Sequence, residues 1–371
     1  MNIRFDKIHG HAGASRVGAS VDQSLLLTAA LIFIAQQAIE FAMLVILQKS
    51  YASLCLWDCG WYATIVEHGY DLEPHGHSRG DAANWAFFPA LPTIAKVLFH
   101  LFGLSAAGSL ILTGKAFFFL AIFWFMKFAR LYSPGVPAWL AGMAVAFSPY
   151  AIYGNVGYTE PLFLFWTCSF FYFLKQKEWV TSGLCGAFLT STRLVGVLVV
   201  FSYLVSTLKR FRSNADSRLE ILLGLLLIPL GLASFMLALY LVVGDSLAFS
   251  HVQRAWGREP QNPLWIISKG LHGSAFDVYS TVTALAALFL SLIILMQRRY
   301  ELAIFSLVCS VIPLSTGLWS LPRYMWWQAP LLLLVVELVH KTRSTFVAIP
   351  AGATALLFMY ASWFSGKEFV I

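Results

Sequence analysis

The stretch that decides the fold is SLLLTAALIFIAQQAIEFAMLVIL, residues 24–47, followed closely by LWDCGWY, residues 56–62. The first part is a long apolar segment, and roughly 17 to 25 such residues are enough to cross the hydrocarbon core of a bilayer. The second part places Asp58 between Trp57 and Trp61. Tryptophan and tyrosine collect at membrane–water interfaces, but packing does not explain a carboxylate held between two indoles. We therefore treat Asp58 as a candidate functional residue at a membrane boundary.

The composition of the whole chain is that of a membrane protein. Of its 371 residues, 59% are hydrophobic and 12% are charged, which is about half the charged fraction of a soluble domain. Apolar segments recur up to the C-terminus, so we predict an all-α polytopic membrane protein with a single integral domain at 24–371. Residues 1–23 contain no apolar run, and we predict a disordered cytoplasmic tail there.

The basic residues predict the topology. They cluster between the apolar segments at 127–130, 175–177, 209–218, 298–299 and 341–343. Because positive residues favour the cytoplasmic side of a membrane, we place all these clusters there. The net charge of +7 therefore indicates the lipid bilayer as a partner and does not indicate nucleic acid.

This arrangement predicts about eleven transmembrane helices. The loops at 49–84, 154–159, 244–276 and 318–323 then face the extracytoplasmic side. The run 87–102 must lie at that face, so that 49–104 forms a first outer loop with juxtamembrane helices. The run 180–208 must cross as two short helices that meet near residues 191–193, and such a break is tolerated where it lines a polar cavity.

The five cysteines do not predict a disulfide framework, because their number is odd and three of them lie inside apolar segments. Cys55 and Cys59 can pair only if the local geometry suits the bond, and we do not expect them to. His75, His77 and Asp81 are a weak alternative as metal ligands, because no helix or strand frames them. We expect no metal site.

The unusual polar residues fall together on the outer face. Acids concentrate in the first outer loop, and arginines lie in the later ones. This pattern suits a reaction in which a base activates a hydroxyl while cations hold a phosphate leaving group. Arg193 is the most telling of them, because an arginine within a hydrophobic run is costly and usually functional; its structural alternative is pairing with Glu160. Arg323 could be a topological anchor, and Glu160 could serve only the helix that it opens.

Several short motifs in their order along the chain resemble one known family. They are Trp57-Asp58-x-x-Trp61-Tyr62, Glu67-His68-Gly69-Tyr70, Phe87-Phe88-Pro89-x-Leu91-Pro92, Tyr158-Thr159-Glu160, Gln253-x-x-Trp256-Gly257 and Pro322-Arg323-Tyr324. Together they resemble the PIG-V family, the GPI mannosyltransferase II group with its bacterial relatives, over about residues 24 to 340.

The resemblance implies a fold and an activity. The fold is a GT-C-like helical bundle with a catalytic first extracytoplasmic loop. The activity is the inverting transfer of a sugar, mannose by family, from a polyprenyl- or dolichyl-phosphate donor to a hydroxyl of a glycan or glycolipid acceptor, with no cofactor and with Asp58 as the base. The substrate-binding residues would be Trp57, Trp61, Tyr62, Glu67, His68, Tyr158, Glu160, Arg193, Gln253, Arg254, Trp256, Arg323 and Tyr324.

The sequence also bears on the source and on competing functions. It contains no Asn-x-Ser/Thr sequon and is shorter than expected of eukaryotic members, which favours a bacterial inner-membrane protein with its site on the periplasmic face and argues against a GPI acceptor. A transporter or flippase of a lipid-linked glycan is the main alternative, and a non-catalytic membrane subunit is another. The lack of internal repeats and the clustering of polar residues on one face argue against a transporter.

Overall fold

The computed structural model describes residues 9–76 and 79–366, with side chains from residue 22 onward. The regular secondary structure of this part is helical apart from one isolated β-bridge between Gly76 and Ala82. The first half contains α1 (His9–Ile46), η1 (Tyr51–Leu54), α2 (Asp58–His68), η2 (Asn84–Ala86), α3 (Ala90–Phe102), α4 (Ala106–Tyr132), α5 (Ala138–Ala146), η3 (Pro149–Gly154), α6 (Glu160–Gln176) and α7 (Trp179–Thr192). The second half contains η4 (Leu194–Leu198), α8 (Val199–Ser213), α9 (Arg218–Leu227), α10 (Leu230–Val243), α11 (Ala248–His251), η5 (Val252–Trp256), α12 (Pro263–Leu271), α13 (Ala275–Met296), α14 (Tyr300–Leu314), α15 (Leu321–Trp326), α16 (Ala329–Lys341) and α17 (Thr345–Phe364).

The bundle is that of a multi-span membrane protein. Among the described residues, 6 helical segments are long and apolar enough to cross a bilayer. They are Asp22–Ile46, Ala106–Tyr132, Leu194–Ser213, Arg218–Val243, Ala275–Met296 and Thr345–Phe364. The predicted all-helical membrane fold is therefore confirmed.

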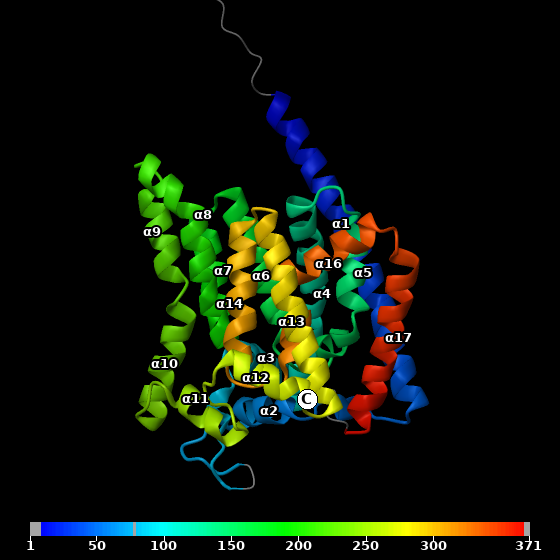
Figure 1. The fold of residues 1–371 in the computed structure, drawn as a ribbon, viewed down its shortest axis with the longest axis vertical. Helices are drawn as coiled ribbons and strands as arrows, with labels where there is room; N and C mark the ends of the chain where they lie inside the picture. The colour runs from blue at the N-terminus through cyan, green and yellow to red at the C-terminus, as the bar shows by residue number, and fades with distance from the viewer. Residues whose placement is uncertain (1–8, 77–78, 367–371) are drawn as a thin grey trace, which may run out of the picture.

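The two ends of the bundle differ in what they carry. The helices α2, α3, α11 and α12 gather at one end, and the α8–α9 and α16–α17 turns lie at the other (Figure 1). The apolar run 87–102, which the predicted topology puts on the same side of the membrane as Asp58, contains α3. This helix packs against α2 and α4. This packing puts α3 beside the helix that begins at Asp58, and its position at a membrane face stays a prediction. The basic turn at 209–218 lies at the opposite end, as the charge pattern requires.

The predicted helix break is present at Arg193. Helix α7 ends at Thr192, Arg193 is extended, and η4 and α8 follow. The side-chain hydroxyls of Thr190 and Thr192 donate hydrogen bonds to backbone carbonyls of the preceding turn. Such bonds compete with the backbone hydrogen bonds of a regular helix. A Cβ on Gly196 would lie 2.4 Å from the carbonyl oxygen of Leu189, so only glycine allows the returning chain to pass so close.

The start of the chain differs from the predicted tail. Residues 1–8 of that tail lie outside the described residues, and the backbone from His9 onward continues α1. Adding a residue to an existing helix is easy compared with starting a new one, so a small, polar segment can extend a membrane span into water.

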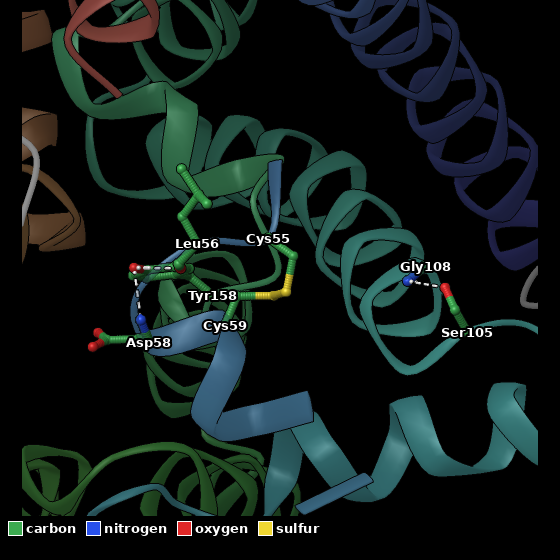
Figure 2. The surroundings of a disulfide bond; sticks show 7 residues. All are labelled: Cys55, Leu56, Asp58, Cys59, Ser105, Gly108 and Tyr158. Atoms are coloured by element: carbon green, nitrogen blue, oxygen red, sulfur yellow. Dashed lines mark hydrogen bonds between the residues drawn. A yellow bond between two sulfur atoms is a disulfide. The ribbon is translucent and has the colours of Figure 1, made fainter. Parts of the chain in front are cut away.

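Cys55 and Cys59 form a disulfide, contrary to our expectation (Figure 2). The turn between η1 and α2 brings the Cα atoms of Cys55 and Cys59 to 5.1 Å, within the range that the bond requires. The sequence did not reveal this turn because it depends on Trp57, a bulky residue that adopts a φ of 55°, where non-glycine residues are uncommon. Cys168, Cys185 and Cys309 are free and buried.

Candidate active site

A cavity of about 310 Å³ lies at the end of the bundle that carries α2. Its walls come from α2, the α7–η4 break, the η5 segment, α14 and α15. Of the residues predicted from sequence, it brings together Asp58, Tyr62, Tyr158, Arg193, Gln253, Trp256, Arg323 and Tyr324. These residues lie far apart in the chain, and the fold collects them around one space.

Ion pairs connect the charged side chains of this cavity. Arg323 donates from Nη2 to Oδ2 of Asp58 at 3.0 Å, and its Nε lies 3.0 Å from Oε1 of Glu160. That second contact is ionic and lacks the alignment of a hydrogen bond. Arg193 donates from Nη2 to the same Glu160 oxygen at 2.5 Å. Glu160 thus bridges two arginines, and its side chain is 0% exposed.

Burial makes this pairing necessary. The side chain of Arg323 is 4% exposed, and an unpaired charge at such a site would be strongly destabilising. Aromatic faces add to the stabilisation of both cations, because the guanidinium of Arg193 lies 4.7 Å from the ring centre of Tyr324 and that of Arg323 lies 5.0 Å from Tyr158. The structural alternative for Arg193, pairing with Glu160, is therefore realised, and Arg193 also lines the cavity.

The chain just before α6 approaches the disulfide closely at Gly157. Gly157 has a φ of +72°, and a Cβ on it would lie 2.9 Å from Sγ of Cys59. Only glycine can take this conformation at this distance. Gly157 therefore sits directly against the disulfide, and the hydroxyl of the next residue, Tyr158, reaches the start of α2.

Asp58 is held by its backbone and by its carboxylate. The Tyr158 hydroxyl accepts from the Asp58 amide at 3.1 Å and donates to the Leu56 carbonyl at 3.3 Å (Figure 2). The Asp58 carboxyl points away from the disulfide. Its side chain is 33% exposed, so the acid is fixed in place and remains accessible from the cavity. Its location at the first turn of α2 also favours a negative charge.

Some predicted residues do not reach the cavity. Glu67 and His68 lie at the far end of α2, about 14 Å along the axis from Asp58, where both are exposed and their side chains approach to 3.7 Å. Trp57 is 42% exposed and is not among the lining residues. Trp61 packs beside the cavity, stacked on Phe87.

Arg254 is also absent from the cavity, and Arg258 takes its place. Residues three apart share a face of a 3₁₀-helix, so Gln253 and Trp256 of η5 line the cavity while Arg254 is exposed. Arg258 follows the left-handed Gly257 and turns back toward the cavity. Arg258 was missed from the sequence because nothing in the sequence orients the turn at Gly257.

No metal-binding cluster is found among the described residues, in which no group of three or more His, Cys, Asp or Glu side chains could hold an ion. His77 lies outside the described residues. His75 contacts the Glu73 carbonyl and approaches Asp71. Metal independence stays a prediction.

A charged cavity of paired carboxylates and arginines inside a helical membrane bundle is the kind of site found in membrane-embedded enzymes. The chain belongs to the PIG-V mannosyltransferase family: the family profile described as "Mannosyltransferase (PIG-V)" matches residues 21–268, more than half of the chain. The predicted family and enzyme class, a membrane mannosyltransferase, are thereby confirmed. No curated protein matches the sequence.

Two solved structures from an archaeon match most of this chain at low sequence identity. The Archaeoglobus fulgidus oligosaccharyltransferase in complex with Zn and sulfate has 13% identity and a TM-score of 0.45, over 93% of this chain and 53% of that one. The oligosaccharyltransferase AglB of the same organism, with an inhibitory peptide and a dolichol-phosphate, has 12% identity and a TM-score of 0.44, over 94% of this chain and 56% of that one. The chain thus spans about half the length of these structures.

Proposed function

We propose that this chain is a GT-C-type enzyme that transfers mannose from a polyprenyl- or dolichyl-phosphate donor to a hydroxyl of a glycan or glycolipid acceptor, with Asp58 as the general base. The observation that carries the proposal is the position of Asp58. Its carboxylate is accessible, lines the cavity, and is oriented by Arg323 at 3.0 Å. A base fixed at a cavity wall is the requirement for activating an acceptor hydroxyl.

The reaction that this site supports is a single displacement. The acceptor oxygen attacks the anomeric carbon of the sugar and forms the new glycosidic bond while its proton moves to the Asp58 carboxylate. The bond between the anomeric carbon and the phosphate oxygen breaks, and its electron pair leaves with the lipid phosphate. Attack from the face opposite the leaving group inverts the anomeric configuration. Because the phosphate leaves as a stable anion, no general acid is required.

The cavity offers surfaces that suit the parts of such a donor. Arg193, Arg258 and Arg323 line the cavity and outnumber the carboxylates of Asp58 and Glu160 that pair with them, which gives a net positive charge for a leaving phosphate. Trp256 offers a flat apolar face on which a sugar ring can rest. Phe88 and Phe249 belong to an apolar part of the lining that suits an isoprenoid chain.

We further propose that the site faces the extracytoplasmic side, in a chain that crosses the bilayer about eleven times. Two independent features support this sidedness. The disulfide beside Asp58 persists in oxidising compartments and is rare in the cytosol. The basic turn at 209–218 lies at the opposite end of the bundle and fits the cytoplasmic side. For a bacterial protein, these features support a position of Asp58 at the periplasmic face of the inner membrane.

A transfer assay tests the proposed function directly. Purified protein in detergent is incubated with a radiolabelled synthetic polyprenyl-phosphate mannose and membrane extract from a deletion strain, and labelled products are separated from the lipid donor. We expect label to move to a new product and polyprenyl phosphate to accumulate. Binding of the donor without release of mannose would overturn the proposal in favour of the transporter alternative. Mass spectrometry of glycans and lipids from the deletion strain then identifies the acceptor.

A further inference from the structure

The charges around the cavity do not balance. Arg193, Arg258 and Arg323 line it, and the carboxylates paired with these arginines belong to Asp58 and Glu160. Three cations and two anions leave one positive charge. In the described part of the chain, Arg258 is the cavity arginine without an ion pair, because Arg193 and Arg323 share Glu160 and Arg323 also holds Asp58.

The guanidinium of Arg258 is held only weakly by neutral groups. It donates to Oε1 of Gln253 and to Oγ of Ser320, each at 3.5 Å, which is at the long limit for a hydrogen bond. Glu259, the next residue, is exposed and does not line the cavity. A strong acceptor could therefore replace both contacts with little loss.

The backbone around Arg258 is better fixed than its head group. The Arg258 amide donates to the Gln253 carbonyl at 3.2 Å, and the Gln261 amide donates to the Ser315 carbonyl at 2.7 Å. These bonds tie the segment to η5 and to the end of α14. The side chain thus reaches into the cavity from a held segment, while its donors stay available for a ligand.

We propose that Arg258 binds the phosphate of the lipid-linked sugar and of the polyprenyl phosphate product. The proposal rests on the proposed function for its donor class. A phosphodiester carries one negative charge, which matches the one unbalanced positive charge of the cavity. Arginine binds phosphate oxygens through its planar fork, and this guanidinium is not already committed to a carboxylate. Arg193 and Arg323 then serve mainly to position Glu160 and Asp58.

The probe that tests this is undecaprenyl phosphate, with undecaprenol as its uncharged counterpart. Affinity for each lipid is measured by fluorescence or native mass spectrometry on the full-length protein in detergent. For Arg258→Gln we expect a roughly 10- to 100-fold weaker affinity for the phosphate, the loss typical of a hydrogen bond to a charged group, and unchanged affinity for undecaprenol. Arg258→Lys should recover part of the loss, because it restores the charge without the fork.

Two variants separate phosphate binding from a structural role. Arg254→Gln removes an equally basic but exposed side chain from the same loop. Ser320→Ala removes one of the two neutral contacts of Arg258 and leaves its charge in place. Both should bind undecaprenyl phosphate like the wild type. In steady-state assays, Arg258→Gln should raise the KM for the donor and leave the KM for the acceptor unchanged.

The outcomes distinguish this inference from the proposed function. If the wild type binds undecaprenyl phosphate and Arg258→Gln binds it equally well, the assignment of Arg258 is wrong and the proposed donor class stands. If the wild type binds no better to the phosphate than to undecaprenol, the donor class fails, and the assignment of Arg258 fails with it. An equal loss in Arg254→Gln would also overturn the assignment, because it would show a general effect of surface charge.

Discussion

Replacing Glu160 by glutamine should weaken both the fold and the site. The substitution keeps the size of the side chain but removes the anion that neutralises Arg193 and Arg323. Breaking a buried ion pair from one side costs about 3–5 kcal/mol. We expect the lower end, about 3 kcal/mol, because Arg193 is 16% exposed and keeps Thr159 at 2.8 Å, and Arg323 keeps Asp58.

The change in activity should exceed the change in stability. Without Glu160, Arg323 has one anchor fewer and no longer fixes the direction of the Asp58 carboxylate. A misplacement of about 1 Å at such a base can cost roughly 100-fold in rate. Thermal unfolding of the detergent-solubilised protein measures the first effect, and kcat per folded molecule measures the second.

Matched variants make this prediction refutable. Glu67→Gln removes an exposed carboxylate near the end of α2 and should leave both quantities unchanged. Glu160→Gln combined with Arg193→Gln removes one unneutralised cation and should regain part of the stability but none of the activity. If Glu160→Gln unfolds at the same temperature as the wild type and retains full turnover, the buried charges do not organise the site.

Three further changes probe the supports of the site. Tyr158→Phe removes the hydroxyl that holds the backbone of Asp58 and should cost about 1–2 kcal/mol, with a fall in kcat and an unchanged donor KM in steady-state assays. Reduction of the adjacent disulfide should lower kcat without releasing the lipid donor, and full activity in dithiothreitol would contradict this. Lys115→Met removes the ammonium group whose Nζ lies 2.6 Å from Oε1 of Glu40, so that Glu40 stays buried without its ion-pair partner and the unfolding temperature should fall. Adding Glu40→Gln to the same chain should restore the unfolding temperature. An unfolding temperature unchanged by Lys115→Met alone would show that this pair contributes nothing to stability.

The membrane fold could be predicted from sequence because hydrophobic length and basic clusters are local signals. The break at Arg193 was equally visible, since an arginine inside an apolar run must lie where a polar partner or cavity receives it. The structure supplies that partner in Glu160. The same count of sides predicted that the run 87–102 stays on the side of Asp58, and the structure adds that α3 packs against α2.

What the sequence could not provide was the direction of side chains in irregular segments. Choosing Arg258 over Arg254 would have required knowledge of the left-handed turn at Gly257, which lies next to Trp256, a residue that packs against Trp61 and Phe87 far away in the sequence. Placing Glu67 with Asp58 ignored the length of α2, which carries the two acids to opposite ends. The disulfide depended on a positive φ at Trp57, a conformation that local propensity does not favour.

The role of Asp58 is tested most directly by the transfer rate of Asp58→Asn. Asparagine preserves the size of the side chain and one acceptor for Arg323, but it cannot take the proton of the acceptor hydroxyl. We predict a loss of roughly 10²- to 10⁴-fold in kcat, the contribution typical of a general base, with donor affinity close to that of the wild type. A folded Asp58→Asn protein that binds polyprenyl-phosphate mannose and transfers mannose at the wild-type rate would contradict the mechanism.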